Sequence, residues 1–366
     1  MSRAALWLIV SVALIFSIGL LMVFNTTAAE VIDRSLTTST HAALFKQIMY
    51  GVIGIAGGLL IYAWGYQNLI KWSVPLLIGG TVLLVLVFVP GFGMTINGAR
   101  RWLGIAGMPL GQPSEFIKVL IPAAYIHWYL LQKGPIQFVP FLKALASLSI
   151  PVALILIEPD NGTTFIIFLL FVVLFLLSRV RLFYWALPLF VLSVMGGAVA
   201  YNMPHVHNRI QVYLHPELDL RGKGHQPHQA KIAAGSGKLL GRGLGESLQK
   251  FNYLPEARSD YIAAIYAEEM GFIGVLALIA LYITMTACGL YIAIQSKEKG
   301  AFLLAATLTF LISIQAFLNL GIVSGLLPSK GMTLPFFSQG GSSLMVNLVV
   351  FFILLDISRK QLCLKS

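Results

Sequence analysis

Hydrophobic residues in this 366-residue chain gather in long, nearly unbroken runs, unlike the spaced pattern of a helix that packs one face on a soluble core. About twenty consecutive apolar residues are enough to cross a bilayer as a helix. We predict ten such spans, at residues 4–24, 44–64, 72–89, 114–131, 141–157, 163–177, 183–201, 261–294, 301–326 and 343–355. The eighth is long enough to be tilted or to project beyond the bilayer. The predicted fold class is therefore an all-α polytopic membrane protein.

The composition supports this fold class, because 58% of residues are hydrophobic and only 11% are charged. We expect a single membrane domain over residues 1–366, with one large extracytoplasmic loop at 202–260 between the seventh and eighth spans. A net charge of +11 suggests nucleic acid in a soluble protein, but membrane orientation explains many of these basic residues. Nucleic acid is not an expected partner. Cys288 and Cys363 have neither the spacing nor the context of a disulfide or metal site.

The distribution of charge predicts the orientation in the membrane. An even number of spans puts both termini on one side. If that side is cytoplasmic, the inner loops are strongly basic and hold only Glu298 and Asp356 as acidic residues, as the positive-inside rule requires. The inner basic residues are then Arg3, Lys71, Lys133, Lys143, Arg179, Arg181, Lys297, Lys299, Arg359, Lys360 and Lys365.

The segment 254–271 is the first candidate for chemistry, because it gathers carboxylates at the edge of a long apolar helix. Ionisable groups beside a membrane span are costly and are functional candidates by default. If the helix begins near Ser259, Asp260, Ala264 and Glu268 share one small, acidic face. Alternatively, Ser259 and Asp260 only cap the helix. The four carboxylates are those of Glu256, Asp260, Glu268 and Glu269.

Four outer segments combine charge with glycine or proline, at 97–102, 158–163, 238–260 and 328–343. Each joins two spans on the same face of the membrane, so they can converge over one cavity. The second contains Asp160. The third contains GRGLG at 241–245, which is a weak phosphate-binding motif because no strand precedes it and no P-loop lysine follows; a flexible loop is the alternative.

Three further groups each allow two interpretations. Glu115 and Lys118 stand three residues apart, as an ion pair or as catalytic groups. Trp102 beside the arginines marks an interfacial belt or a site for a lipid-linked sugar pyrophosphate. The histidines of the large loop include a His-x-His pair, which suits a metal or is an ordinary loop feature. These histidines are His205, His207, His215, His225 and His228.

The order of several motifs resembles the SEDS family of ten-span membrane proteins, which comprises FtsW, RodA and SpoVE. The motifs are NGARRW, QPSEFIK, EPDNGT, GRGLGES, LPEARSD followed by EEMGFIG, and PSKGMTLPFFSQGGSS. They run over nearly the whole chain. Within the family, YLPEA and Lys330-Gly331 are more similar to the division branch, FtsW, than to RodA. Departures from the usual pattern are Glu158, His225, Arg258 and Gln339.

The resemblance implies a peptidoglycan glycosyltransferase that polymerises lipid II into glycan strands during cell division. Asp260 matches the essential aspartate of the family and would act as the general base for a sugar hydroxyl. Arg101, Arg258 and Lys330 would hold the pyrophosphate. Further candidate substrate-binding residues are Trp102, Glu115, Lys118, Asp160, Arg242, Ser338 and Ser342.

The resemblance also implies a cofactor, partners and a location. A divalent cation, Mg²⁺ or Mn²⁺, is expected. No outer segment is long enough to be a cross-linking domain, so we expect a class B penicillin-binding protein as transpeptidase partner, along with other division proteins and membrane lipid. The location would be the bacterial cytoplasmic (inner) membrane, with multiple spans and cytoplasmic termini. A lipid II flippase or transporter, an elongation polymerase of the RodA type and a non-catalytic scaffold are the alternatives.

Overall fold

The computed structural model describes residues 2–34, 41–96, 98–105, 108–202, 213, 225–250 and 257–363. Its elements are α1 (Arg3–Arg34), α2 (Ala42–Trp64), α3 (Tyr66–Lys71), α4 (Ser73–Phe88), β1 (Gly93–Ile96), β2 (Ala99–Ile105), β3 (Met108–Gly111), α5 (Pro113–Leu130), α6 (Phe138–Ile157), α7 (Asn161–Leu177), α8 (Leu182–Tyr201), α10 (His225–Ser236), α11 (Ile262–Ile294), α12 (Lys299–Val323) and α13 (Gly341–Cys363).

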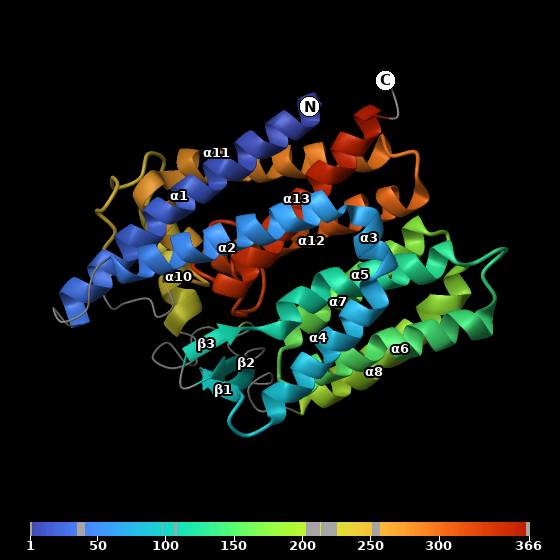
Figure 1. Ribbon diagram of the computed structural model, residues 1–366. Coiled ribbons are helices and arrows are strands. Elements are labelled where there is room, and N and C mark those ends of the chain that lie inside the picture. Colours follow the sequence, from blue (N-terminus) through green and yellow to red (C-terminus); the bar gives the residue numbers. More distant parts are fainter. Residues whose placement is uncertain are drawn as a thin grey trace.

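All ten predicted spans are helices, which lie side by side in one bundle (Figure 1). Among the described residues, α1, α2, α6, α11, α12 and α13 are long and apolar enough to cross a membrane, while α4, α7 and α8 are shorter apolar helices. Helix α5 carries Glu115, Lys118 and His127 and is less apolar. The architecture is that of an all-α, multi-pass membrane protein.

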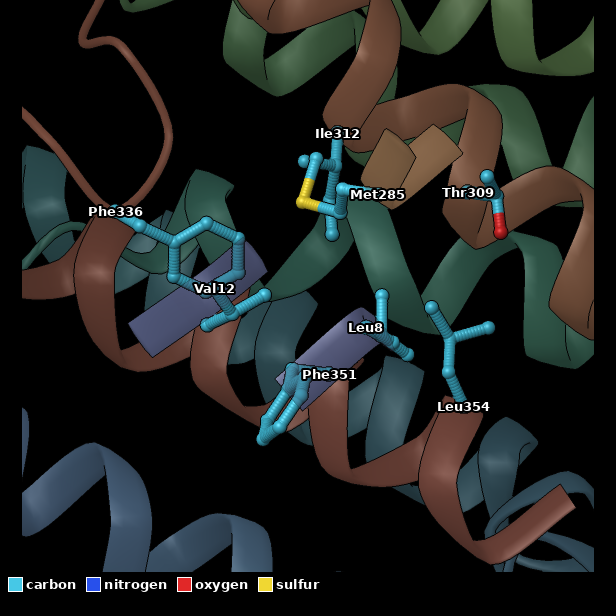
Figure 2. Close-up of a pocket in the computed structure, with 8 residues that line it drawn as sticks. All are labelled: Leu8, Val12, Met285, Thr309, Ile312, Phe336, Phe351 and Leu354. Atoms are coloured by element: carbon cyan, nitrogen blue, oxygen red, sulfur yellow. The ribbon is translucent and has the colours of Figure 1, made fainter. Parts of the chain in front are cut away.

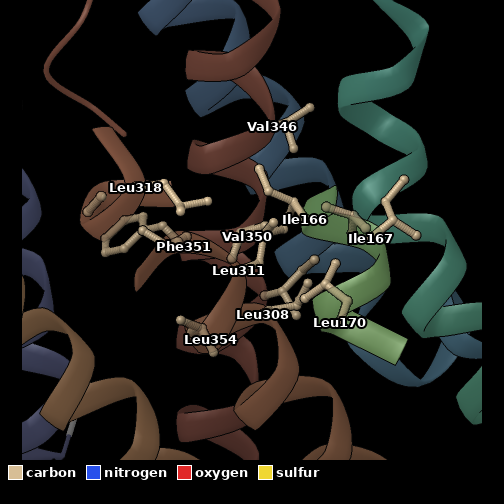
Figure 3. Packing of buried hydrophobic residues seen from close by; sticks show 14 of the residues in the cluster. Ile166, Ile167, Leu170, Leu308, Leu311, Leu318, Val346, Val350, Phe351 and Leu354 are labelled. Carbon is tan, nitrogen blue, oxygen red and sulfur yellow. The ribbon is translucent and has the colours of Figure 1, made fainter. Parts of the chain in front are cut away.

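The centre of the bundle is formed by α12, most of whose side chains are buried. Figure 3 shows Leu308 and Leu311 of α12 in one cluster with Ile166 and Leu170 of α7 and Val350 of α13. Lipid tails are as apolar as these side chains, so close packing rather than escape from water stabilises helix association in a membrane. The seam between α2 and α13 follows this rule, because a Cβ at Gly58 would lie 2.1 Å from a ring atom of Phe352.

The two termini lie at the same end of the bundle (Figure 1). The hydroxyls of Ser2 and Ser358 are 2.7 Å apart. The turn before α12 reaches the same end, since the Tyr66 hydroxyl donates to Glu298 at 2.8 Å and the Tyr66 amide donates to Asp356 at 2.8 Å. This arrangement agrees with the predicted even number of spans.

A three-stranded antiparallel sheet, in the order β1-β2-β3, was not predicted. It lies between α4 and α5 at the opposite end from the termini (Figure 1). Ile96 pairs with Ala99, and Gly98 between them has φ 76°. The Asn97-Gly98 dipeptide is typical of a two-residue hairpin loop, so it is the sequence feature that could have predicted this sheet.

Helix α11 is not the continuous span that we predicted. Gly271 has φ 65° and ψ −168°, which breaks the helix after its first nine residues. A residue with this backbone interrupts the regular hydrogen-bond ladder. The first part of α11, Ile262–Met270, is therefore a short helix joined to a longer membrane helix.

The described part of the large loop packs on this broken helix. Helix α10 contacts both α11 and α12. His225 and His228 lie in α10. The other loop histidines, His205, His207 and His215, and the carboxylate Glu256 lie outside the described residues.

Candidate active site

The turn between α6 and α7 forms one wall of the candidate site. Asp160 is the N-cap of α7, and its carboxylate accepts from the Thr163 amide at 3.2 Å and the Thr163 hydroxyl at 2.8 Å. Gln112, just before α5, donates its side-chain amide to Asp160 at 3.0 Å. The residue before α5 is thus in direct contact with the predicted outer segment 158–163.

Arg101 holds this turn from the sheet. Its Nε donates to the carbonyl of Glu158 at 3.0 Å and its Nη2 to the carbonyl of Pro159 at 2.7 Å. Two bonds from one guanidinium fix both the position and the direction of the peptide groups. Arg101 is therefore engaged with the protein's own backbone. Its neighbour Trp102 pairs with Met94 in the sheet.

Lys330 brings the last outer segment to the same place. Its Nζ lies 3.8 Å from Oδ1 of Asp160, with the lysine side chain 20% exposed. The aliphatic part lies on Gly162, where a Cβ would be 2.5 Å from the lysine Cε. Burial alone would raise the pKa of Asp160, but Lys330, then Arg101 and the bonds from Thr163, lower it below its ordinary value. Asp160 is consequently ionised at neutral pH.

Asp260 lies next to this group. Oδ2 of Asp260 is so close to Gly331 that a Cβ there would be only 2.6 Å away. Asn319 of α12 donates both to the backbone carbonyl of Asp260, at 2.9 Å, and to that of Met332, at 2.6 Å. One buried amide thus holds the Asp260 turn and the Lys330 segment together. Nothing in our sequence analysis singled out Asn319, although a polar residue inside an apolar span is a signal of such a role.

The capping alternative does not match the position of Asp260. Helix α11 begins at Ile262, and its N-cap residue is Tyr261, so Ser259 and Asp260 both precede the cap. Arg258 is tied to the last outer segment, because its carbonyl accepts from the amide of Gln339 at 3.0 Å. The turn before α11 is therefore anchored at Arg258 and at Asp260 itself.

Glu158 differs sharply from Asp160. Its side chain is fully buried, and neither carboxylate oxygen has a hydrogen-bond partner among the described residues. Burial raises the pKa of Glu158 to about 8, with the negative charge of Asp160 adding to the effect and Arg101 opposing it. The carboxyl group is therefore mostly protonated at neutral pH.

The two predicted serines have structural contacts. The Ser342 hydroxyl accepts from the Gln112 amide at 2.9 Å, and the Ser338 hydroxyl accepts from the Leu334 amide at 2.8 Å. Both serines are buried. Both hydroxyl oxygens thus help to shape the last outer segment.

Glu115 and Lys118 form the ion pair that their spacing suggested. Oε2 and Nζ are 2.8 Å apart, and Lys118 is only 2% exposed. Both lie at the start of α5, directly after Gln112. A buried charge with a close partner is consistent with either of the two roles.

The small acidic face expected on α11 is not formed. Glu268 turns to the large loop, where it accepts from the amides of Leu248 at 3.2 Å and Gln249 at 3.3 Å. Arg242 lies 3.5 Å from the same carboxylate and is partly exposed. The Glu268 carboxylate is therefore engaged by the large loop and by Arg242.

No group of three or more His, Cys, Asp or Glu residues suited to a metal ion occurs in the part of the chain that the structure describes. A cavity of about 10 Å³ lies deep among α1, α11, α12 and α13, lined mainly by apolar residues such as Leu8, Met285 and Phe351 (Figure 2). That is room for roughly one water molecule. It is far too small for a substrate.

Comparison with known proteins gives the family. The family model for FtsW, RodA and SpoVE, described as "Cell cycle protein", matches residues 5–362. The "Probable peptidoglycan glycosyltransferase FtsW" of Trichlorobacter lovleyi is 34% identical over 359 residues, covering 96% of this chain and 92% of the relative. "Stage V sporulation protein E" of Bacillus subtilis is 36% identical over 358 residues, covering 97% and 96%.

The fold is also found among solved structures. A chain from a peptidoglycan synthase complex, studied for the coordination of polymerization and crosslinking, superposes with a TM-score of 0.76 at 24% identity, and the match covers 97% of each chain. The motifs, the ten spans and the full-length matches agree. The chain belongs to the FtsW/RodA/SpoVE family of cell cycle proteins.

Proposed function

We propose that this chain polymerises lipid II into the glycan strands of peptidoglycan, with Asp260 as the general base. Its family and its full-length relatives make it an enzyme of the peptidoglycan glycosyltransferase class. The observation that carries the assignment of the site is the contact of the Asp260 carboxylate with Gly331, directly beside the Lys330–Asp160 pair. A base and a cation are thus held within one small region at the end of the bundle opposite the termini.

The proposed step needs both groups. Asp260 takes the proton of an acceptor sugar hydroxyl as that oxygen bonds to the anomeric carbon of the donor glycan. The bond between this carbon and the donor pyrophosphate breaks, and the lipid pyrophosphate leaves with the electron pair. The new glycosidic bond, the protonated carboxyl group and the released lipid pyrophosphate account for all atoms and charges.

The leaving pyrophosphate requires positive charge. Lys330 suits this role, because it directly precedes Gly331, where the Asp260 carboxylate lies, and its side chain is partly exposed. Arg258 is half-buried and precedes Asp260 by two residues in sequence. Arg101 donates to two backbone carbonyls, so we assign it to positioning of the turn rather than to direct contact.

A divalent cation would need the substrate to complete its ligands. The described residues offer carboxylates at Asp260 and Asp160, and the latter is already paired with Lys330. Mg²⁺ is commonly held by one or two carboxylates together with substrate phosphate oxygens. Such an ion would neutralise charge on the pyrophosphate, and Asp260 is the carboxylate that would hold it.

We place the reaction at the outer face of the bacterial cytoplasmic (inner) membrane, with both termini in the cytoplasm. The positive-inside distribution of charge supports this orientation, and the site lies at the end away from the termini. The FtsW and SpoVE relatives favour a role in division over elongation. The match to a peptidoglycan synthase complex supports a class B penicillin-binding protein as partner.

A lipid II flippase is the second candidate. It would need charged or polar groups along a path across the membrane. Among the described residues, Lys118 is paired with Glu115, and Glu268 and Glu269 are bound to the large loop. Purified protein in liposomes with labelled lipid II distinguishes the candidates: polymer indicates a polymerase, translocated lipid a flippase, and neither a scaffold.

The decisive variant is Asp260→Asn. Asparagine keeps the size of aspartate but cannot take a proton, so we expect polymerisation to fall by about 10²- to 10⁴-fold. The melting temperature and lipid II binding should remain near wild type. Glu246→Gln, at an exposed carboxylate of the same loop, is the control and should remain active. Activity of Asp260→Asn within a few-fold of wild type would eliminate Asp260 as the base.

A further inference from the structure

The break in α11 is filled by a segment of the large loop. In a continuous helix the carbonyls of Glu268 and Glu269 accept from the amides four residues later. Here they accept instead from the amides of Arg242 and Gly243, each at 3.0 Å. Residues 238–243, which we call the splint, therefore replace the missing partners of these two carbonyls.

Amides of α11 also donate hydrogen bonds to carbonyls of the splint. The amide of Phe272 donates to the carbonyl of Lys238 at 2.9 Å, and that of Ile273 donates to the carbonyl of Leu239 at 3.2 Å. These are the two amides that the break leaves without a helical acceptor. These two carbonyls and two amides of α11 thus have their partners in the splint, as buried backbone requires.

Two glycines make this contact possible. A Cβ at Gly241 would lie 2.1 Å from the carbonyl oxygen of Glu269, and one at Gly271 would lie 2.2 Å from the amide nitrogen of Gly241. Both glycines also have positive φ, 81° and 65°. The first glycine of GRGLG, Gly241, therefore packs against the backbone of α11. This role differs from both a phosphate-binding loop and a flexible loop.

A buried ion pair holds the end of the short helix Ile262–Met270 to the large loop and to α1. Oε1 of Glu269 lies 3.1 Å from Nζ of Lys250, and both side chains are almost fully buried. Lys250 also donates to Asn25 of α1 at 2.8 Å, and Asn25 donates to the other oxygen of Glu269. Removal of one partner from such a pair is strongly destabilising, because the other charge is left unpaired.

We infer that the splint is a positioning device for Asp260. A straight helix of the 33 residues of α11 would be about 50 Å long, well beyond a hydrocarbon core of about 30 Å. The break lets Ile262–Met270 take its own direction, and the splint and Glu269 fix that direction. Asp260 precedes this short helix by two residues, so its carboxylate is held at Gly331 by the same contacts. The inference rests on the proposed function.

The test compares Gly241→Ala with Gly91→Ala. Both glycines have positive φ, 81° and 92°, but no atom lies within 4 Å of a Cβ at Gly91. We expect Gly241→Ala to lower kcat by about tenfold or more with KM within about threefold, because misplacement of a catalytic group by 1 Å is costly. Gly91→Ala should stay within about threefold of wild type in kcat. Equal kcat in the two variants would overturn the inference.

A second pair of variants covers the case in which Gly241→Ala does not fold. Glu269→Gln leaves Lys250 buried without its charge partner, and Glu269→Gln combined with Lys250→Met removes both charges. We expect a lower kcat at unchanged KM in the single variant and recovery of kcat in the double variant. A single variant as active as wild type, or a double variant as impaired as the single one, contradicts the proposal.

Hydrogen exchange separates this inference from the proposed function. The amides of Phe272 and Ile273 should exchange faster in Gly241→Ala, or in Glu269→Gln, than in wild type and Gly91→Ala. If wild type makes no glycan but the exchange changes as expected, the proposed function fails while the splint stands. If wild type is active and neither exchange nor kcat responds, the inference fails and the proposed function stands.

Discussion

Glu158 and Asp160 lie in the same turn, but their carboxyl groups differ in protonation state at neutral pH. Asp160 has Lys330, Gln112 and Thr163 around it and is kept ionised. The Glu158 side chain has none of these partners and is kept mostly neutral at pH 7. Because the two lie on opposite sides of one proline, sequence adjacency alone does not reveal their different states.

The environment of Glu158 predicts a pH-dependent stability. The ordinary pKa of a glutamate is 4.5, and the pKa of Glu158 in the folded protein is about 8. Between these two pH values the folded state therefore binds more protons than the unfolded state. Stability then decreases as pH rises, by up to roughly 1.4 kcal/mol per pH unit. A glutamine at this position does not ionise, so Glu158→Gln should not lose stability in this way. We expect the melting temperature of Glu158→Gln minus that of wild type to be larger at about pH 8 than at about pH 5.

The exposed Glu246→Gln is the control for this measurement and should show no such trend. A constant difference between Glu158→Gln and wild type across the pH range would show that Glu158 is ionised in the folded state.

The buried Glu115–Lys118 pair has a test of its own. If its role is structural, Lys118→Met should lower the melting temperature more than Lys118→Met combined with Glu115→Gln, because the single change leaves a carboxylate unpaired at a cost of about 3–5 kcal/mol. Thermal unfolding in detergent measures this difference. Two well-folded but inactive variants would instead indicate a direct role of Lys118 at the substrate.

At the scale of elements, the site depends on close approach of the last outer segment to the start of α11. Gly331 is the point of contact, since a Cβ there would lie 2.6 Å from the Asp260 carboxylate. Asn319 ties the backbones of both segments to α12. The segment and the helix therefore set the position of the base together.

This contact makes Gly331→Ala informative. The added methyl group must displace the carboxylate, and we expect a loss of about 10²-fold in polymerisation with lipid II binding retained. Gly134→Ala is the matched control, because no atom lies within 4 Å of a Cβ at that glycine. Glycan-strand formation from lipid II by both variants is the measurement, and equal activity would show that the carboxylate can move without consequence.

At the scale of the whole molecule, the ten helices bring the termini and the Glu298 turn to one end and the candidate site to the other. The positive-inside rule then predicts which end is cytoplasmic. Reporter fusions at Lys297 and at Lys223, the latter outside the described residues, should report opposite compartments. The same compartment for both would contradict the ten-span arrangement.

The proposed partner is also testable on the whole chain. A glycan polymerase without a cross-linking domain needs a transpeptidase, and we expect a class B penicillin-binding protein to co-purify in mild detergent. Full activity of the isolated chain, together with repeated failure to recover such a protein, would argue against an obligate partner.

What the sequence determined by itself is the set of membrane helices. Run length and hydropathy are local properties, and each of the ten predicted runs is a helix. The motif order likewise indicates the family, and the resemblance predicts Asp260, Asp160, Arg101 and Lys330 as site residues. Even the unpredicted sheet has a local signal, the Asn97-Gly98 dipeptide.

Only the tertiary structure decided how the carboxylates divide their roles. Glu268 and Glu269 look equivalent to Asp260 in the sequence, but the Glu268 carboxylate binds the large loop and that of Glu269 binds Asn25, which lies 244 residues away along the chain. The break at Gly271 likewise forms because a distant segment supplies its missing hydrogen bonds. Contacts between residues far apart in the chain leave no periodic pattern in the sequence, so their partners emerge only when the helices pack.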